Sequence, residues 1–261
     1  MTTKIKPESK KVKLNSGINL HYLDWGNHGA PDVLLLHGLR GHAHSWDDVS
    51  LALCQDYRVV ALDQRGRGES DWAPEGDYSG SAFVEDILGF SNALNLDGFT
   101  LVGHSMGGRN SLAFAGRHSE KLAKLCIVDI GPSVDPRGGQ RITQELINVP
   151  ETFEDFEAVV AYMAKGNRFA SEAVMRRRLR YATKELSSGE IGCIVLGARP
   201  YSLDILQCKE VARYVLEVNS GDVSRFGRSS RRCGFGSVVQ NSVPTYRGKA
   251  HIGLSWRNPL C

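Results

Sequence analysis

A serine near the middle of the chain has the sequence context of a catalytic nucleophile. Ser105 lies in G-H-S-M-G, residues 103–107, which fits G-x-S-x-G, the pattern of a serine on a sharp turn between a strand and a helix. Residues 99–102 are mostly apolar, as in a buried strand, and residues 106–116 have apolar side chains at helical spacing. Glycines flank the serine because a strained turn and a close helix–strand crossing both require small residues. The sequence therefore predicts a nucleophilic serine at position 105.

Composition and charge narrow the classes of protein to which this serine can belong. The chain has 261 residues, 41% of them hydrophobic and 23% charged, with a net charge of +3. The composition is typical of a globular protein. The net positive charge is too small to indicate a nucleic-acid partner. No apolar run approaches the ~20 residues of a membrane span, and the polar N-terminus has no signal-peptide pattern. We expect a cytoplasmic protein without a membrane span.

Strand-like and helix-like segments alternate through the first half of the chain. Apolar runs predict a hairpin and then parallel strands, and helical spacing predicts the connections between them. The predicted strands cover residues 11–14, 18–25, 32–36, 57–62, 99–102 and 122–130, and the predicted helices cover residues 45–55, 78–96 and 106–116. This order is typical of an α/β fold with a mostly parallel, doubly wound sheet. In such sheets ligands bind at the carboxyl ends of the strands, where Ser105 falls.

The spacing of apolar side chains changes after residue 132, which predicts an insertion. From residue 133 to about residue 186 the apolar side chains follow helical spacing throughout. The expected organisation is a sheet-containing core made of residues 1–132 and 199–261, with a helical cap insertion at 133–198. The arginines of this insertion, at positions 176–178 and 180, are expected on a solvated helix face.

Four motifs together resemble the α/β-hydrolase family with a helical cap. They are His37-Gly38, D-Q-R-G-R-G-E-S at 63–70, G-H-S-M-G-G at 103–108 and V-D-I-G-P at 128–132. The motifs occur in the family's order, and the likeness covers roughly residues 15 to 186. The resemblance implies the α/β-hydrolase fold and a Ser-His-acid triad.

The family's chain order of serine, acid and histidine implies the partners of Ser105. Only His118 and His251 follow the serine, and His118 falls near the end of the same predicted helix, which leaves His251 as the base. Asp222 follows an apolar run and precedes His251 by 29 residues, similar to the family's spacing, so it is the expected acid. Asp129 is the alternative, because some relatives place the acid after that strand.

The resemblance also implies the oxyanion donors and the reaction. The backbone N–H groups of Leu39 and Met106 are expected to hold the oxyanion. A carboxylic ester or thioester would be cleaved through an acyl-enzyme, with a small ester-like substrate and no metal or organic cofactor. The alternatives are a C–C bond hydrolase or lyase or a cofactor-free haloperoxidase on the same triad, and a catalytically inactive binding protein. The sequence does not indicate the substrate or the oligomeric state.

The last part of the chain departs from the family pattern. Residues 223–261 contain seven Arg or Lys and no Asp or Glu, and residues 225–236 have three glycines where a helix is expected. Two interpretations stay open. Either a divergent C-terminus keeps Asp222 and His251 as triad members, or the segment after about Gly192 is abnormal and their spacing is a coincidence.

Overall fold

A six-stranded sheet forms the main part of the described chain. The computed structural model of the protein describes residues 5–73, 76–130, 148–166 and 171–193, so Asp222, His251 and the expected core segment 199–261 lie outside the described residues. The strands lie in the order β1-β2-β4-β3-β5-β6. Their bounds are β1 Glu8–Lys13, β2 Asn19–Asp24, β3 Asp32–Leu36, β4 Arg58–Leu62, β5 Phe99–His104 and β6 Leu122–Val128.

Strand direction divides this sheet into two parts. The β1–β2 hairpin is antiparallel, and β2 pairs antiparallel with β4, whereas β4, β3, β5 and β6 are mutually parallel. A tight turn at Gly17, with φ +88°, closes the hairpin. The outermost strand β1 carries three lysines, Lys10, Lys11 and Lys13. The prediction of a mostly parallel sheet with an antiparallel edge is confirmed.

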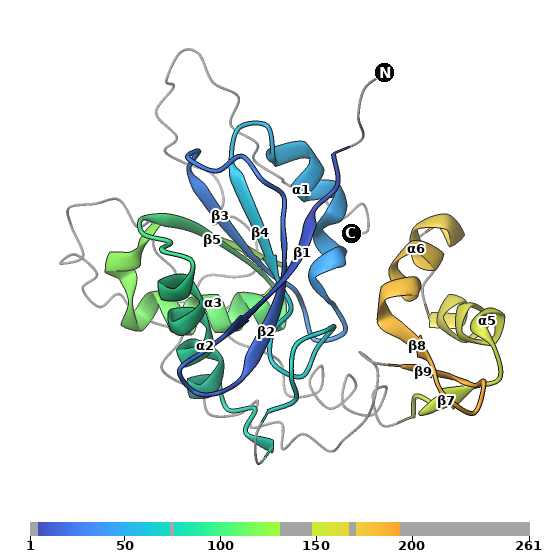
Figure 1. The fold of residues 1–261 in the computed structure, drawn as a ribbon. Coiled ribbons are helices and arrows are strands. Elements are labelled where there is room, and N and C mark those ends of the chain that lie inside the picture. The colour runs from blue at the N-terminus through green and yellow to red at the C-terminus, as the bar shows by residue number, and fades with distance from the viewer. Residues whose placement is uncertain (1–4, 74–75, 131–147, 167–170, 194–261) are drawn as a thin grey trace, which may run out of the picture. The chain divides into compact units, whose positions relative to one another are not determined.

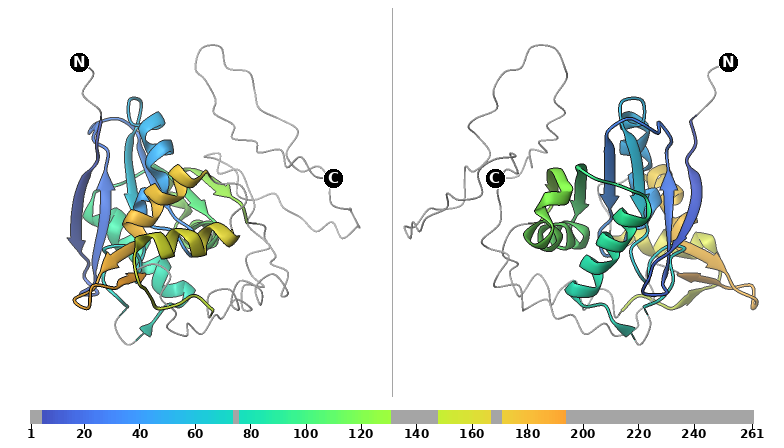
Figure 2. Two further views of the ribbon diagram at one scale, coloured as in Figure 1. Left: turned by 90° about the vertical axis from the view of Figure 1, so that its right-hand side faces the viewer. Right: turned by 60° about the vertical axis from the view of Figure 1, so that its left-hand side comes forward.

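The alternation of side chains along each strand gives the sheet two buried faces. Leu34, Leu36 and Leu101 point toward α2 (Gly80–Ala93) and α3 (Met106–Arg117), while Val33 and Leu35 point toward α1 (Asp47–Leu53) and the preceding 3-10 helix η1 (Ala43–Trp46). Helices therefore cover both sides of the sheet, with α1 opposite α2 and α3 (Figure 1). Figure 2 shows α2 and α3 together on one side of the strands. This layering is the reason that the parallel strands read as continuous apolar runs.

The described part of the insertion contains strands as well as helices. Helices α5 (Phe156–Gly166) and α6 (Glu172–Ala182) accompany a small antiparallel sheet, in the order β7-β9-β8, made of β7 (Thr152–Phe153), β8 (Thr183–Glu185) and β9 (Ile191–Cys193). The expectation of helix throughout residues 133–186 is therefore wrong at β7 and β8. The insertion has its own apolar cluster, which includes Phe153, Val159 and Leu179.

The domain boundary expected at residue 199 lies outside the described residues. Within the described ranges, no helix combines the length and the apolar composition that a membrane span requires.

Candidate active site

Ser105 occupies a strained turn between β5 and α3. Its backbone has φ 51° and ψ −113°, a conformation that non-glycine residues rarely adopt. The Ser105 N–H donates to the carbonyl of Val128 at 2.9 Å, and the Ser105 carbonyl accepts from the N–H of Arg109 at 3.0 Å. Two ordered neighbours, β6 and the first turn of α3, thus hold the serine in this conformation. The sharp strand-to-helix turn predicted from the motif is confirmed.

The glycines on either side make this turn sterically possible. A Cβ atom at Gly107 would lie 2.4 Å from the carbonyl oxygen of Leu36, and one at Gly103 would lie 2.4 Å from the carbonyl oxygen of Gly107. Both contacts are with backbone, which cannot move aside as a side chain can. The helix α3 can therefore start this close to β3 only because residues 103 and 107 have no side chain.

The loop after β3 lies directly beside the serine. A Cβ atom at Gly38 would lie 3.3 Å from the Cβ of Ser105. The Gly38 carbonyl accepts from His37 Nδ1 at 2.7 Å and from the Gly41 N–H at 2.9 Å, so its direction is fixed. In a trans peptide the N–H points opposite to the carbonyl, and the N–H of Leu39 is therefore fixed as well. The Leu39 carbonyl in turn accepts from Nε of Arg67 at 3.0 Å.

The second expected oxyanion donor is the N–H of Met106, in the first turn of α3. N–H groups in a first helical turn have no intrahelical acceptor, which leaves them free to bind an anion. Met106 follows Ser105 directly and its side chain is buried. The roles of Leu39 and Met106 remain predictions, supported by the fixed peptide at Gly38 and the position of Met106.

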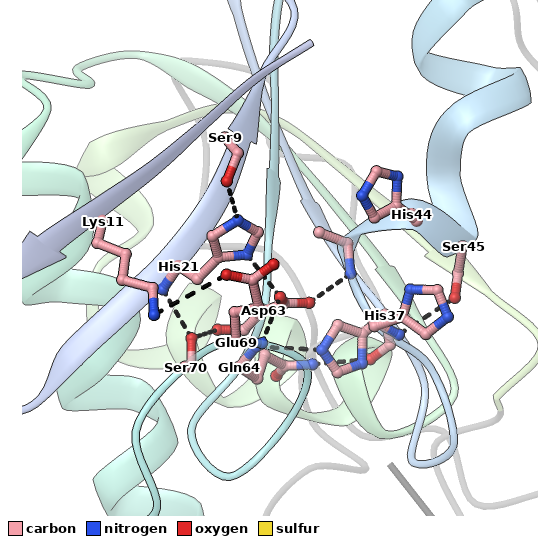
Figure 3. A network of polar contacts seen from close by, with 12 residues as sticks. Ser9, Lys11, His21, His37, His44, Ser45, Asp63, Gln64, Glu69 and Ser70 are labelled. Carbon is pink, nitrogen blue, oxygen red and sulfur yellow. Dashed lines mark hydrogen bonds and ion pairs between the residues drawn. The ribbon is translucent and has the colours of Figure 1, made fainter. Parts of the chain in front are cut away.

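A buried amide links the loop after β3 to the loop after β4 and to α3. The Gln64 side chain donates to the His37 carbonyl at 2.7 Å and accepts from Nδ2 of Asn110 at 2.8 Å. The backbone N–H of Gln64 donates to Nε2 of His37 at 3.1 Å. Figure 3 shows these contacts between His37 and Gln64. Because His37 donates at Nδ1 and accepts at Nε2, this network requires the neutral ring.

We expect the buried His37 ring to make the fold sensitive to acid. Burial lowers the pKa of His37 from 6.5 to about 4. Between these values the unfolded chain binds a proton that the folded chain does not, so the free energy of unfolding decreases as pH falls. The limiting slope for one such group is about 1.4 kcal/mol per pH unit. Guanidinium unfolding at pH values from about 7 to about 5 measures this slope. The His37→Gln variant lacks the titrating ring and is expected to give a flatter profile, and an equal slope would contradict the assignment.

Asp63 fixes the loop that follows β4. Its Oδ1 accepts from the N–H of Ala43 at 2.5 Å, and its Oδ2 accepts from the N–H of Glu69 at 3.0 Å and contacts Nδ1 of His21 at 2.6 Å. Burial alone would raise the pKa of Asp63, but the hydrogen bonds from His21 and Ala43 outweigh burial and lower it. Asp63 is therefore ionised when the loop is formed. The sequence motif marked this loop but gave no indication of the partner His21.

Arg65 connects the same loop to α2. Its Nε and Nη2 donate to the two carboxylate oxygens of Asp86 at 2.5 and 2.7 Å, and its Nη1 donates to the carbonyl of Asp77 at 2.8 Å. Both members of this ion pair are buried. Burial raises the pKa of Asp86, and the bidentate contact with Arg65 opposes that rise.

Among the described residues, no histidine contacts the hydroxyl of Ser105. Seven of the eight histidines lie within them, and none of these seven has a ring nitrogen hydrogen-bonded to the Ser105 hydroxyl. His118 follows the 12-residue helix α3, about 18 Å along its axis from Ser105. The roles of Asp222 and His251 stay predictions.

Asp129, the alternative acid, lies just after β6. It has φ 57°, its side chain is 83% exposed, and its Oδ2 lies 3.6 Å from Nε2 of His104. The histidine beside Asp129 is therefore His104, which directly precedes the nucleophile in the sequence. Among the described residues, no three His, Cys, Asp or Glu side chains are grouped so that they could hold a metal ion.

Contacts from α6 reach the segment that follows the Gly38 loop. Nε2 of His42 donates to the carbonyl of Arg178 at 3.2 Å, and the ring of His44 stacks on Tyr181 with centroids 3.5 Å apart. Burial lowers the pKa of His42. One face of the inserted helix thus lies against residues close in sequence to the expected oxyanion donor.

Two proteins named as hydrolases match parts of the sequence. A 3-hydroxybutyrate-oligomer hydrolase of Cupriavidus necator is 36% identical over 157 residues, which are 58% of this chain and 53% of that protein. A 2-(acetamidomethylene)succinate hydrolase of Mesorhizobium japonicum is 30% identical over 134 residues, 51% of this chain and 48% of that protein. The chain therefore spans about half the length of each relative.

Comparisons of fold and of family agree with these matches. The crystal structure of an alpha/beta hydrolase from Novosphingobium aromaticivorans has a TM-score of 0.67 and 23% identity, covering 81% of this chain and 79% of its own. The family model for the alpha/beta hydrolase fold matches residues 31–186, more than half of the chain. Together with the turn at Ser105 and the layered sheet, this match shows that the chain belongs to the alpha/beta hydrolase family.

Proposed function

We propose that the protein is a serine hydrolase that cleaves a carboxylic ester or thioester through an acyl-enzyme. The observation that carries this proposal is the position of Ser105, held at φ 51° directly beside the Gly38 loop, whose peptide carbonyl has two donors. A fixed nucleophile next to fixed backbone N–H groups is the arrangement that acyl transfer requires. The matched relatives are hydrolases, which supports a hydrolytic reaction.

The reaction follows from the roles of these groups. Ser105 Oγ attacks the substrate carbonyl carbon while its proton passes to the imidazole of His251, and the carbonyl oxygen becomes an oxyanion. The N–H groups of Leu39 and Met106 stabilise that charge, and loss of one such donor costs about 10²–10³ in rate. The imidazolium then protonates the leaving alcohol or thiol. Water, deprotonated by the same histidine, releases the acid and restores the serine.

Elimination supports His251 as the base. A serine hydroxyl is a weak nucleophile unless an adjacent base takes its proton. None of the seven described histidines hydrogen-bonds to Ser105, and His251 is the eighth histidine of the sequence. Asp222 is the proposed acid because it precedes His251 by 29 residues, which is similar to the spacing of acid and histidine in the family. Asp129 is the alternative acid.

Labelling with a fluorophosphonate tests the nucleophile and the acid separately. We expect phosphonylation of Ser105, mapped by peptide mass spectrometry, and a strongly reduced rate of labelling at that site in His251→Gln. Of the two matched variants Asp222→Asn and Asp129→Asn, only the first is expected to reduce the rate. If Ser105 stays unlabelled in folded protein, the catalytically inactive binding protein becomes the better interpretation. A loss confined to Asp129→Asn would move the acid to that position.

A further inference from the structure

A second serine, far from Ser105 in the sheet, contacts a histidine that is itself bound to a buried carboxylate. Oγ of Ser9 lies 2.9 Å from Nε2 of His21, and Nδ1 of His21 lies 2.6 Å from Oδ2 of Asp63. Figure 3 shows the three side chains in line, with Ser9 on the outer strand and Asp63 in the interior. The order of contacts, hydroxyl to Nε2 and Nδ1 to carboxylate, is the one that activates a serine in acyl transfer.

The surroundings of His21 fix the form of its ring. Asp63 accepts from two backbone N–H groups, of Ala43 and Glu69, and stays ionised, so toward Nδ1 of His21 it can only accept a hydrogen bond. The neutral ring therefore has its proton on Nδ1 and a free lone pair on Nε2. That lone pair points at the Ser9 hydroxyl. His21 and Asp63 are buried, at 1% and 3% exposure, which keeps them in this arrangement.

Ser9 itself is accessible. It is an exposed residue of β1, the outermost strand of the six-stranded sheet. Lys11 lies two residues further on the same face of the strand, directly opposite His21 in the register. Its Nζ lies 3.9 Å from Oε2 of Glu69, so this charge is shared with a carboxylate at the same surface. Four strand-to-strand steps separate β1 from β5, which is about 19 Å, so the two serines belong to different sites.

We propose that Ser9 is a second nucleophilic serine, which takes an acyl or phosphonyl group from small activated donors at the outer edge of the sheet. With a fluorophosphonate, Ser9 Oγ forms a bond to phosphorus, the P–F bond breaks and fluoride leaves. The hydroxyl proton passes to Nε2 of His21 and from there to water. With an activated ester, Oγ bonds to the carbonyl carbon and the alcohol leaves with the proton. The product is a chain modified on β1 rather than in the active site.

The test is carried out on the full chain with Ser105→Ala, so that the active site cannot react. A fluorophosphonate is added, and the modified peptides are quantified by mass spectrometry over time. Ser81 is the internal control, because it is also exposed but its hydroxyl contacts the hydroxyl of Ser79 instead of a histidine. A general base contributes at least about 10²-fold, so we expect Ser9 to react about 10²-fold faster than Ser81.

Two variants separate activation from mere exposure. His21→Asn keeps a donor for Asp63 in place of Nδ1 and removes Nε2, and should reduce Ser9 modification to the rate of Ser81. Ser9→Ala should remove the label from that peptide altogether. Equal rates at Ser9 and Ser81 would by themselves overturn the proposal. Because each site is mapped separately, a failure at Ser9 is distinct from a failure at Ser105 in the unsubstituted chain.

Discussion

Replacing Ser105 by alanine is expected to abolish ester hydrolysis while leaving the fold intact. Loss of a serine nucleophile in a triad reduces kcat on the order of 10⁶-fold, because the remaining groups cannot form the acyl-enzyme. Alanine adopts φ 51° no less readily than serine, so the strain of the turn is unchanged. The measurement is kcat for p-nitrophenyl acetate, together with the unfolding midpoint of both proteins.

A control substitution distinguishes the loss of the nucleophile from the effect of removing any serine hydroxyl. Ser81→Ala alters an exposed serine of α2 and is expected to leave kcat unchanged. Substantial hydrolysis by folded Ser105→Ala would show that another group carries the reaction. In that case the modified residue of the acyl-enzyme, trapped by acid quench, identifies the true nucleophile.

Of all the substitutions proposed, Arg65→Met is expected to cause the largest decrease in the free energy of unfolding. The substitution leaves Asp86 buried without its bidentate partner, and breaking a buried ion pair in this way costs about 3–5 kcal/mol. The loss should be smaller in acid. Burial raises the pKa of Asp86, and without Arg65 nothing opposes that rise, so protonation removes the buried charge as pH falls. Chemical unfolding at two pH values measures both effects.

Two further variants make this result specific. Arg65→Met with Asp86→Leu replaces both partners by apolar side chains and should recover most of the lost stability. Arg176→Met removes an arginine that contacts Glu157 and Glu172 at the surface of the insertion, where solvent screens the charges. Its effect should be much smaller. A loss in Arg176→Met equal to that in Arg65→Met would contradict the role of burial.

The sequence predicted those features that depend on local pattern. The strand at residues 32–36 is observed with the predicted bounds, because both of its faces are buried and every position after Asp32 is apolar. The turn at Ser105 is predictable because only glycine fits at positions 103 and 107. The strands β7 and β8 were missed, since segments of two and three residues are too short to have a period.

Contacts between residues far apart in the sequence could not be predicted from the spacing of residue types. His21 and Asp63 are 42 positions apart, and Gln64 and Asn110 are 46 apart, so neither pair forms a motif. The carboxylate partner of Arg65 likewise lies 21 positions away, in α2. Gln64 meets Asn110 because parallel strands bring the loop after β4 and the helix after β5 to the same edge of the sheet. His21 instead reaches Asp63 from β2, which runs antiparallel to β4.

The three lysines of β1 also bear on how copies of this chain meet one another. An outer strand exposes unpaired N–H and C=O groups that can pair with the edge of another sheet. Lys10, Lys11 and Lys13 outnumber Glu8, the one carboxylate of that strand, so two copies approaching edge to edge would bring like charges together. At 1 M salt the screening length is about 3 Å, so repulsion between charges further apart than this is largely removed. High salt should therefore promote self-association through β1, and Lys-to-Ala changes there should promote it at low salt.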